Sequence, residues 1–159
     1  EDYPKTKPKK NNKIQGAYWV TTRLIRESGP HYLAPIKGPN DVAKLMKDHL
    51  DMENLDREYF CVIYLNRKNF VLAINTVSIG GLTNSLVHPR EVFKPAFLTS
   101  ASAIILVHNH PSGDPTPSKQ DVDVTWRQIE AGKLLGIEVL DHIIIGHNRH
   151  FSLKEKHLI

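Results

Sequence analysis

Residues 108–121 read His-Asn-His-Pro-Ser-Gly-Asp-Pro-Thr-Pro-Ser-Lys-Gln-Asp, and this stretch is the most informative part of the chain. The run before it, Ala-Ile-Ile-Leu-Val at residues 103–107, is short, apolar and rich in β-branched side chains, which is typical of a buried strand. The residues after it favour a helix. The motif therefore lies where a strand ends and a helix begins, a common position for active sites in α/β sheets.

Three side chains of this stretch can bind a metal ion: His108, His110 and Asp121. Zinc takes nitrogen and oxygen ligands of this kind and keeps a fourth position open for water in catalytic sites. Side chains two residues apart on a strand point to the same face, so the two histidines can converge on one ion. The prolines and the glycine at 111–117 exclude regular structure and allow the chain to turn back toward that ion.

The start of the following helix has two interpretations. Ser118 suits the N-cap and Asp121 the third helical position, where the helix dipole and free amides would hold its carboxylate close to the histidines. The same Ser-x-x-Asp pattern is also a plain capping arrangement, which needs no metal. Paired histidines can also arise by chance in a chain with nine of them. The whole constellation nevertheless favours a metal site.

The string His-Asn-His also matches the name of a class of nucleases. In those nucleases the named residues are spread over a ββα unit, whereas here they are consecutive at 108–110. The nuclease interpretation is therefore disfavoured.

The spacing of this motif resembles that of a known enzyme family. The pattern His-x-His-Pro, with Ser118 eight residues after His110 and Asp121 three residues further on, resembles the motif of JAMM (MPN+/JAB) metalloproteases. The full string at 108–121 resembles the bacterial RadC family of JAMM-like proteins. Other stretches that resemble this family lie at 87–92, 130–146 and 151–155. The resemblance covers roughly residues 38–159; longer RadC proteins carry a helix-hairpin-helix-like domain before this part, and we recognise no such pattern in the first thirty-odd residues.

The resemblance implies a fold and an activity. The expected fold is a single three-layer α/β domain, in which helices flank a central mixed sheet, as in JAB/MPN and cytidine deaminase-like proteins. The expected cofactor is zinc, bound by His108, His110 and Asp121. The expected function is hydrolysis of peptide or isopeptide bonds by a zinc-activated water, with a peptide or protein as the substrate.

A JAMM site also uses a glutamate from the start of an early strand as its general base. Glu58 opens the expected strand 58–65 and matches the RadC-like Glu-x-Phe pattern, so we assign the base to Glu58, with Glu53 as the fallback. Glu58 could equally be an ordinary exposed acid at a strand start. The resemblance further implies that Ser118 donates a hydrogen bond to the oxyanion that forms during hydrolysis.

Four further residues near the motif have open interpretations. Asp141 and His142 interrupt an apolar strand, and they could orient a ligand histidine from behind or form a locally satisfied polar break. Trp126 and Ile129 are three residues apart on the motif helix, which predicts that both belong to the core.

Periodicity and breakers predict the remaining elements. In chain order we expect a strand over 17–26, a helix over 39–50, a hairpin of strands 58–65 and 70–77, a helix over 89–99, a strand over 103–108, a helix from 118 to about 136, a strand over 138–145 and a short strand near 150–152.

Length and composition indicate one ordinary globular domain, which we expect to span 17–159. The chain has 159 residues, of which 40% are hydrophobic and 24% charged. No apolar run approaches the ~18 residues of a membrane span. The single Cys61 excludes an internal disulfide and lies in an apolar strand pattern, where a buried, inert thiol is expected. Together these features indicate a cytoplasmic protein.

The net charge of +4 is unevenly distributed, and residues 1–16 are expected to form a basic flexible tail. The lysines of this tail are Lys5, Lys7, Lys9, Lys10 and Lys13. Such a tail can hold nucleic acid by counterion release, although it is also typical of a merely solvated segment. The alternative function is therefore that of an accessory protein in DNA repair whose metal site is structural or idle.

Overall fold

The computed structural model of the chain describes residues 34–80 and 87–159. The expected tail at 1–16 and the expected strand at 17–26 lie outside the described residues, and so does the boundary predicted between them.

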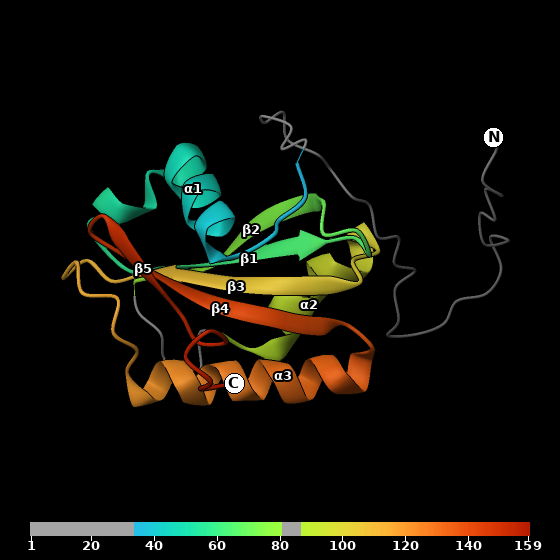
Figure 1. Cartoon of the computed structure of the whole chain (residues 1–159). Helices are drawn as coiled ribbons and strands as arrows, with labels where there is room; N and C mark the ends of the chain where they lie inside the picture. The colour runs from blue at the N-terminus through green and yellow to red at the C-terminus, as the bar shows by residue number, and fades with distance from the viewer. Residues whose placement is uncertain (1–33, 81–86) are drawn as a thin grey trace, which may run out of the picture.

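Three α-helices, one 3₁₀ helix and five strands make up the described part (Figure 1). In chain order they are α1 (Pro39–Leu50), η1 (Met52–Asn54), β1 (Tyr59–Leu65), β2 (Val71–Ile79), α2 (Pro89–Thr99), β3 (Ala103–Asn109), α3 (Lys119–Leu135), β4 (Glu138–Gly146) and β5 (Arg149–Ser152). Each element predicted after residue 34 is present, with strand ends shifted by one or two residues.

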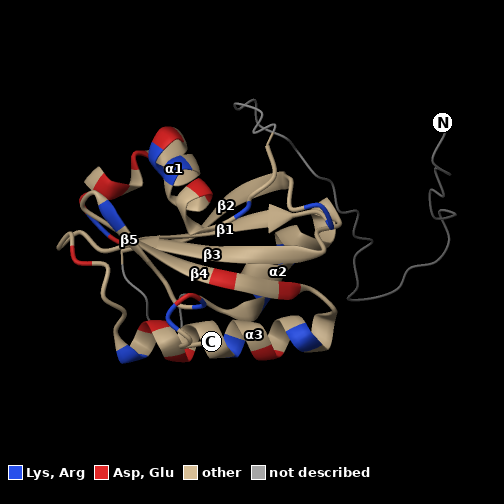
Figure 2. Ribbon diagram, in the orientation of Figure 1, with Lys and Arg blue, Asp and Glu red and all other residues tan. Residues whose placement is uncertain are grey.

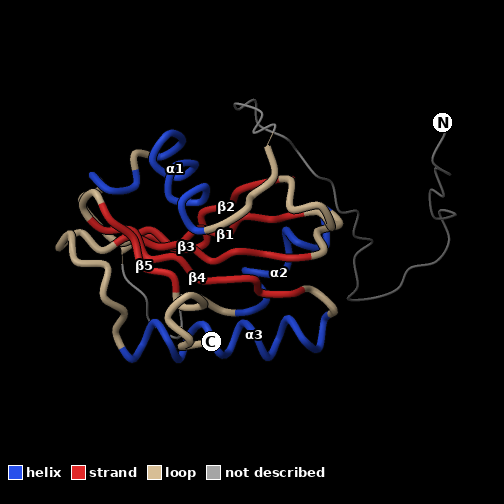
Figure 3. Tube along the Cα trace, viewed as in Figure 1, coloured by secondary structure: helices blue, strands red, loops and turns tan. Residues whose placement is uncertain are grey.

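The five strands form one mixed sheet in the order β2-β1-β3-β4-β5. β3 and β4 are parallel and are joined by α3, whereas the other neighbouring strands are antiparallel. β3 therefore lies in the middle of the sheet, and the end that carries the motif is flanked by β1 and β4 (Figure 3). β1 and β3 contain no Asp, Glu, Lys or Arg, and Figure 2 shows the charged residues mainly on helices and loops.

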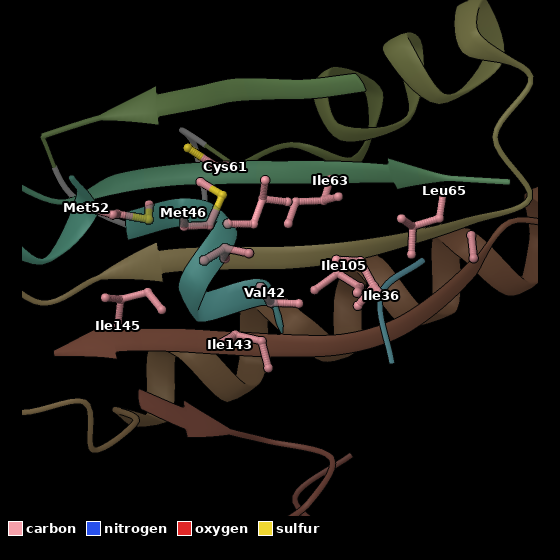
Figure 4. Close-up of a cluster of buried hydrophobic side chains, with 13 residues drawn as sticks. Ile36, Val42, Met46, Met52, Cys61, Ile63, Leu65, Ile105, Ile143 and Ile145 are labelled. Carbon is pink, nitrogen blue, oxygen red and sulfur yellow. The ribbon is translucent and has the colours of Figure 1, made fainter. Parts of the chain in front are cut away.

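Helices cover both faces of the sheet, which confirms the predicted three-layer α/β architecture. α1 packs on one face, where Val42 and Met46 contact a core that includes Ile63, Ile105 and Ile143 (Figures 1 and 4). α2 and α3 cover the opposite face. The second core between them and the sheet contains Phe60, Tyr64, Val87, Val92, Phe93, Leu106 and Val124. Cys61 is fully buried in the first core, as expected.

The face of α3 that packs on the sheet differs from the prediction. Its buried residues are Asp121, Val124, Thr125, Gln128 and Gly132. Trp126 is 43% exposed and Ile129 is only half-buried, so the placement of Trp126 in the core is wrong. The apolar pair misled because the buried stripe of this helix consists largely of polar and small residues, of which Asp121 and Thr125 belong to the adjacent site and Gln128 donates to the Val87 carbonyl.

No described helix is both long enough and apolar enough to cross a membrane.

Candidate metal centre

The end of β3 places two histidines at the edge of the sheet. His108 is the last-but-one residue of β3, is fully buried, and lies opposite Phe60 of β1 and Ile144 of β4. His110 follows directly after the strand, and its backbone N–H still donates to the carbonyl of Ile145, at 2.9 Å. The strand direction is thus kept through His110, which explains why both rings reach the same side.

The loop after His110 folds back onto the end of β4. Gly113 has a φ of +81°, a backbone conformation that favours glycine, and its N–H donates to the carbonyl of His110 at 2.9 Å. His147 in turn donates its N–H to the carbonyl of Gly113, at 3.0 Å. A Cβ at Gly146 would lie 2.4 Å from that carbonyl oxygen, so the loop can dock here only because residue 146 has no side chain.

This loop leads into α3 and brings a carboxylate to the two imidazoles. His108 Nε2 lies 3.0 Å from His110 Nε2 and 3.3 Å from Asp121 Oδ1, and His110 Nε2 lies 3.6 Å from Asp121 Oδ2. One ligand atom from each residue falls within 4.8 Å of the others. The structure therefore brings together the three side chains that the motif predicts as metal ligands.

Capping and ligand geometry coexist at the start of α3. Ser118 is the N-cap, and its Oγ accepts from the Asp121 N–H at 3.2 Å. Asp121 Oδ2 accepts from the Ser118 N–H at 2.6 Å and from its Oγ–H at 2.7 Å. The capping box thus fixes the carboxylate and turns Oδ1 toward His108. The two interpretations of Ser-x-x-Asp are not exclusive.

The charge of Asp121 is held by its neighbours. Burial acts to raise the pKa of this carboxyl, but the imidazoles of His108 and His110, which can donate to it when their Nε2 atoms are protonated, and the bond from Ser118 outweigh burial and hold the pKa well below its usual range. Asp121 is therefore an anionic ligand over the whole physiological range of pH.

A buried chain of hydrogen bonds lies behind His108. Thr125 Oγ1 lies 2.6 Å from the Asp121 carbonyl oxygen, which can only accept, so the single hydroxyl proton of Thr125 is donated there. His142 Nδ1, 2.5 Å from Thr125 Oγ1, must then carry a proton and donate it to that oxygen.

The same reasoning extends from His142 to the ligand. Burial lowers the pKa of His142 well below its ordinary value, so the ring is neutral and its Nε2 is an acceptor. His108 Nδ1, 2.8 Å away, is therefore the donor, and His108 Nε2 carries the lone pair that faces His110 and Asp121.

His110 reaches the same tautomer by a different route. Its Nδ1 lies 2.7 Å from the backbone carbonyl oxygen of Asp114, so Nδ1 is the donor and Nε2 again carries the lone pair. When both rings are neutral, two nitrogen lone pairs and a carboxylate face one another, an arrangement that repels unless a proton or a metal ion lies between them. The donor set fits a divalent metal ion, and its two imidazoles and one carboxylate match ligand sets that zinc takes.

Glu58 lies immediately before β1, the strand that pairs antiparallel with β3. The antiparallel register that pairs Phe60 with His108 brings the segment before β1 alongside the segment that follows His108, and the negative charge of Glu58 acts to raise the pKa of both His108 and His110. The fallback residue Glu53 is instead paired with Lys47 and accepts the Asn148 N–H at 3.3 Å. The geometry favours Glu58 over Glu53 as the acid of this site.

The two residues considered for support behind the ligands lie in different places. His142 contacts His108 and Thr125, as described above. The Asp141 carboxylate accepts from Ser152 Oγ–H at 2.6 Å and from the Lys154 N–H at 3.1 Å, which ties β4 to the turn after β5.

Sequence reasoning missed two residues that contact the site. Thr125 is four residues after Asp121, so helical spacing places both on one face of α3 and could have indicated its role. Asn109, between the ligand histidines, is 1% exposed, and its side chain bonds to β1. No spacing rule reveals that contact, because it depends on which strand pairs with β3.

Comparison with known proteins gives a consistent result. The family model described as RadC-like JAB domain matches residues 36–158. A UPF0758 protein of Caldanaerobacter subterraneus subsp. tengcongensis is 60% identical over 144 residues, which cover 91% of this chain and 60% of that protein. A UPF0758 protein of Desulfitobacterium hafniense is 54% identical over 132 residues, 83% of this chain and 57% of that protein.

A third relative, a UPF0758 protein of Bacillus cereus, is 49% identical over 147 residues. Those residues cover 92% of this chain and 64% of the relative. The chain thus spans less than two thirds of the length of these relatives.

Proposed function

The chain belongs to the RadC-like JAB domain family, and from this premise and the geometry of the site we propose that it is a zinc-dependent hydrolase of peptide or isopeptide bonds. The observation that carries the proposal is the convergence of two imidazole lone pairs and one carboxylate, each fixed by hydrogen bonds from behind. A zinc ion held by His108, His110 and Asp121 would supply a water whose pKa is lowered toward about 7.

Glu58 is the general base in this proposal. The sheet register brings the segment that carries Glu58 alongside the residues after His108, and Glu58 stands outside the three-ligand cluster. Glu58 would hold the proton released when the nucleophile forms and deliver it to the leaving amine nitrogen. The return of that proton matters for an amide bond, because an amine leaves readily only after protonation.

Ser118 would stabilise the oxyanion. Its single hydroxyl proton is directed at Asp121 Oδ2, at 2.7 Å, so that proton must rotate toward the substrate before it can act. Rotation leaves the capping interaction intact, since Ser118 Oγ can still accept from the Asp121 N–H. The substrate would enter on the side of His110, whose side chain is 15% exposed, whereas that of His108 is fully buried.

Metal content and turnover test the proposal together. We expect about one zinc per chain by elemental analysis, lost in His110→Ala and kept in Glu58→Gln. Mass spectrometry of a peptide library should show cleavage by the wild type and a loss of about 10²–10⁴ in rate for Glu58→Gln. Glu91→Gln is the matched control, because Glu91 is an exposed acid of α2 paired with Lys94.

Full activity in Glu58→Gln would refute the assignment of the base. Bound zinc without turnover of any peptide would instead favour the accessory protein with an idle site, which the lysine-rich residues 1–13 would suit.

A further inference from the structure

Asn109 separates the two ligand histidines, and the hydrogen bonds of its side chain run neither to the loop nor to α3 but to the segment before and at the start of β1. Its Oδ1 accepts from the N–H of Tyr59, the first residue of β1, at 2.8 Å, and its Nδ2 donates to the carbonyl oxygen of Arg57, two residues before the strand, at 3.0 Å. These two backbone groups flank Glu58 on either side. A single buried side chain therefore holds the segment that carries the proposed base.

The position of this contact follows from the sheet. The antiparallel ladder between β1 and β3 ends at the pair Phe60–His108. The backbone of Asn109 is paired on the other side, with Ile145 of β4. A carboxamide offers one acceptor and one donor group, as a peptide unit does, so the Asn109 side chain continues the ladder for one more step toward Tyr59 and Arg57.

β2 holds Glu58 from the opposite side. The Glu58 carbonyl oxygen accepts from the Gly80 N–H, at 2.8 Å. The backbone of residues 57–59 is thus bonded on the β3 side through Asn109 and on the β2 side through Gly80. With its backbone held in this way, residue 58 keeps its place alongside the segment that follows His108, as the register of β1 against β3 sets it.

We propose that Asn109 is a positioning residue for Glu58: its carboxamide ties the segment 57–59 to the strand that bears both ligand histidines, and so fixes the base relative to the metal. The proposal rests on the proposed function, which makes Glu58 the base. The positioning role requires that the side chain of residue 109 carry both a hydrogen-bond acceptor and a donor, at the distance from the backbone that asparagine provides. Aspartate keeps the acceptor for Tyr59 and loses the donor to Arg57, and alanine loses both.

The first test needs no substrate. In Asn109→Ala, zinc content should be retained, while exchange of the Tyr59 amide measured by NMR should accelerate by about tenfold or more, since its acceptor is gone. Addition of Zn²⁺ alone should shift the Glu58 carboxyl ¹³C resonance in the wild type, and by less than half as much in Asn109→Ala. An equal shift in both proteins would overturn the proposal, even if no peptide is ever cleaved.

The second test is a double-mutant cycle on turnover. Asn109→Ala should lower kcat by about 10²-fold, the scale expected for a misplaced catalytic group. In the Glu58→Gln background the same substitution should cost no further activity, because the group that Asn109 positions is already disabled. An equal loss in both backgrounds would mean that Asn109 acts independently of Glu58 and would overturn the proposal.

Two variants guard against a merely structural effect. Asn109→Asp is isosteric with the wild type and replaces the alanine variant if that variant does not fold. Its kcat should fall, with zinc retained.

Asn66→Ala is the matched control, because Asn66 Oδ1 accepts the N–H groups of Lys68 and Phe70, at 2.8 and 3.1 Å, in the turn at the far end of β1. Its expected result is unchanged kcat and zinc content. A loss of kcat in Asn66→Ala as large as in Asn109→Ala would refute the positioning role.

Discussion

The two histidines of the site are held by different means. His108 is on a central strand, is fully buried, and is fixed by side chains: His142 behind it and Thr125 behind His142. His110 is on a loop, is partly exposed, and is fixed by a backbone carbonyl, that of Asp114. The strand half of the site thus depends on particular side chains, whereas the loop half depends on how the backbone turns. Substitutions should therefore affect the two halves unequally.

The largest difference is expected when each histidine is removed. His108→Ala leaves a buried cavity and deprives His142 Nε2 of its donor, so the metal-free protein should lose about 2–4 kcal/mol of unfolding free energy. His110→Ala removes a partly exposed ring and should cost about 1 kcal/mol or less. Chemical denaturation with a chelator present measures both. Equal losses would show that the buried chain behind His108 contributes nothing to stability.

The next comparison removes the support and leaves the ligands. Thr125→Val is nearly isosteric but takes away the acceptor of the His142 Nδ1–H, so His142 no longer holds His108 in one tautomer. Zinc affinity should fall about 10–100-fold, as is typical when the partner of a ligand histidine is lost.

Asp114→Ala is the control for the loop half. His110 bonds to the backbone carbonyl of residue 114, which this substitution keeps, so zinc affinity should change by less than about threefold. Competition titration with a chromophoric chelator measures both affinities. A weaker site in Asp114→Ala than in Thr125→Val would invert the comparison.

Features of the site that depend on local sequence could be predicted, whereas contacts between distant segments could not. Apolar periodicity and breakers located β3 and α3, and the capping pattern placed Ser118 and Asp121 within one turn, because these features are local. The convergence of the three ligands followed from strand and helix geometry. The match of Glu58 to the family pattern singled out an acid at the start of β1, the strand whose Phe60 pairs with His108, and its role as the base stays a prediction.

Contacts across the sheet could not be predicted in this way. The role of Asn109 depends on the register of β1 against β3, and that of Gly146 on the docking of a loop distant from it in the sequence. Trp126 was misplaced for a related reason. Apolar residues are expected inside, but the buried face of α3 contains the polar residues Thr125 and Gln128. Gln128 donates a hydrogen bond to the Val87 carbonyl oxygen.

Protonation of the histidines should change the stability of the folded protein in opposite directions in the two halves of the site. Burial lowers the pKa of His108, and that of His142 further, whereas hydrogen bonding to Asp121 raises the pKa of His110. A histidine with a lowered pKa binds its proton in the unfolded state first, so it makes the folded protein less stable as the pH falls below about 6.5. His110 acts in the opposite direction: its contribution is present at low pH and is lost as the pH rises through its raised pKa. The depressed pKa of Asp121 matters only below about pH 4, the ordinary value of the group.

The metal-free protein should therefore lose stability between pH 6.5 and pH 5, by up to about 1.4 kcal/mol per pH unit for each net proton. His142→Gln removes one of the two destabilising protonations and should flatten this dependence. His110→Gln removes the opposing one and should steepen it. Urea denaturation at several pH values compares the three proteins, and a steeper dependence in His142→Gln than in His110→Gln would contradict the assignment.

A small effect on stability, together with the effect most specific to chemistry, is expected at Ser118, where the two halves join. Ser118→Ala removes the acceptor of the Asp121 N–H and should cost about 1 kcal/mol, the usual cost of losing an N-cap. It also removes the proposed oxyanion donor, which should lower kcat by about 10²–10³-fold with zinc retained. Ser118→Thr keeps a capping hydroxyl and serves as the control. Thermal melts and turnover separate the two roles, because a variant that melts early but hydrolyses at the full rate would leave Ser118 only as the cap that orients Asp121.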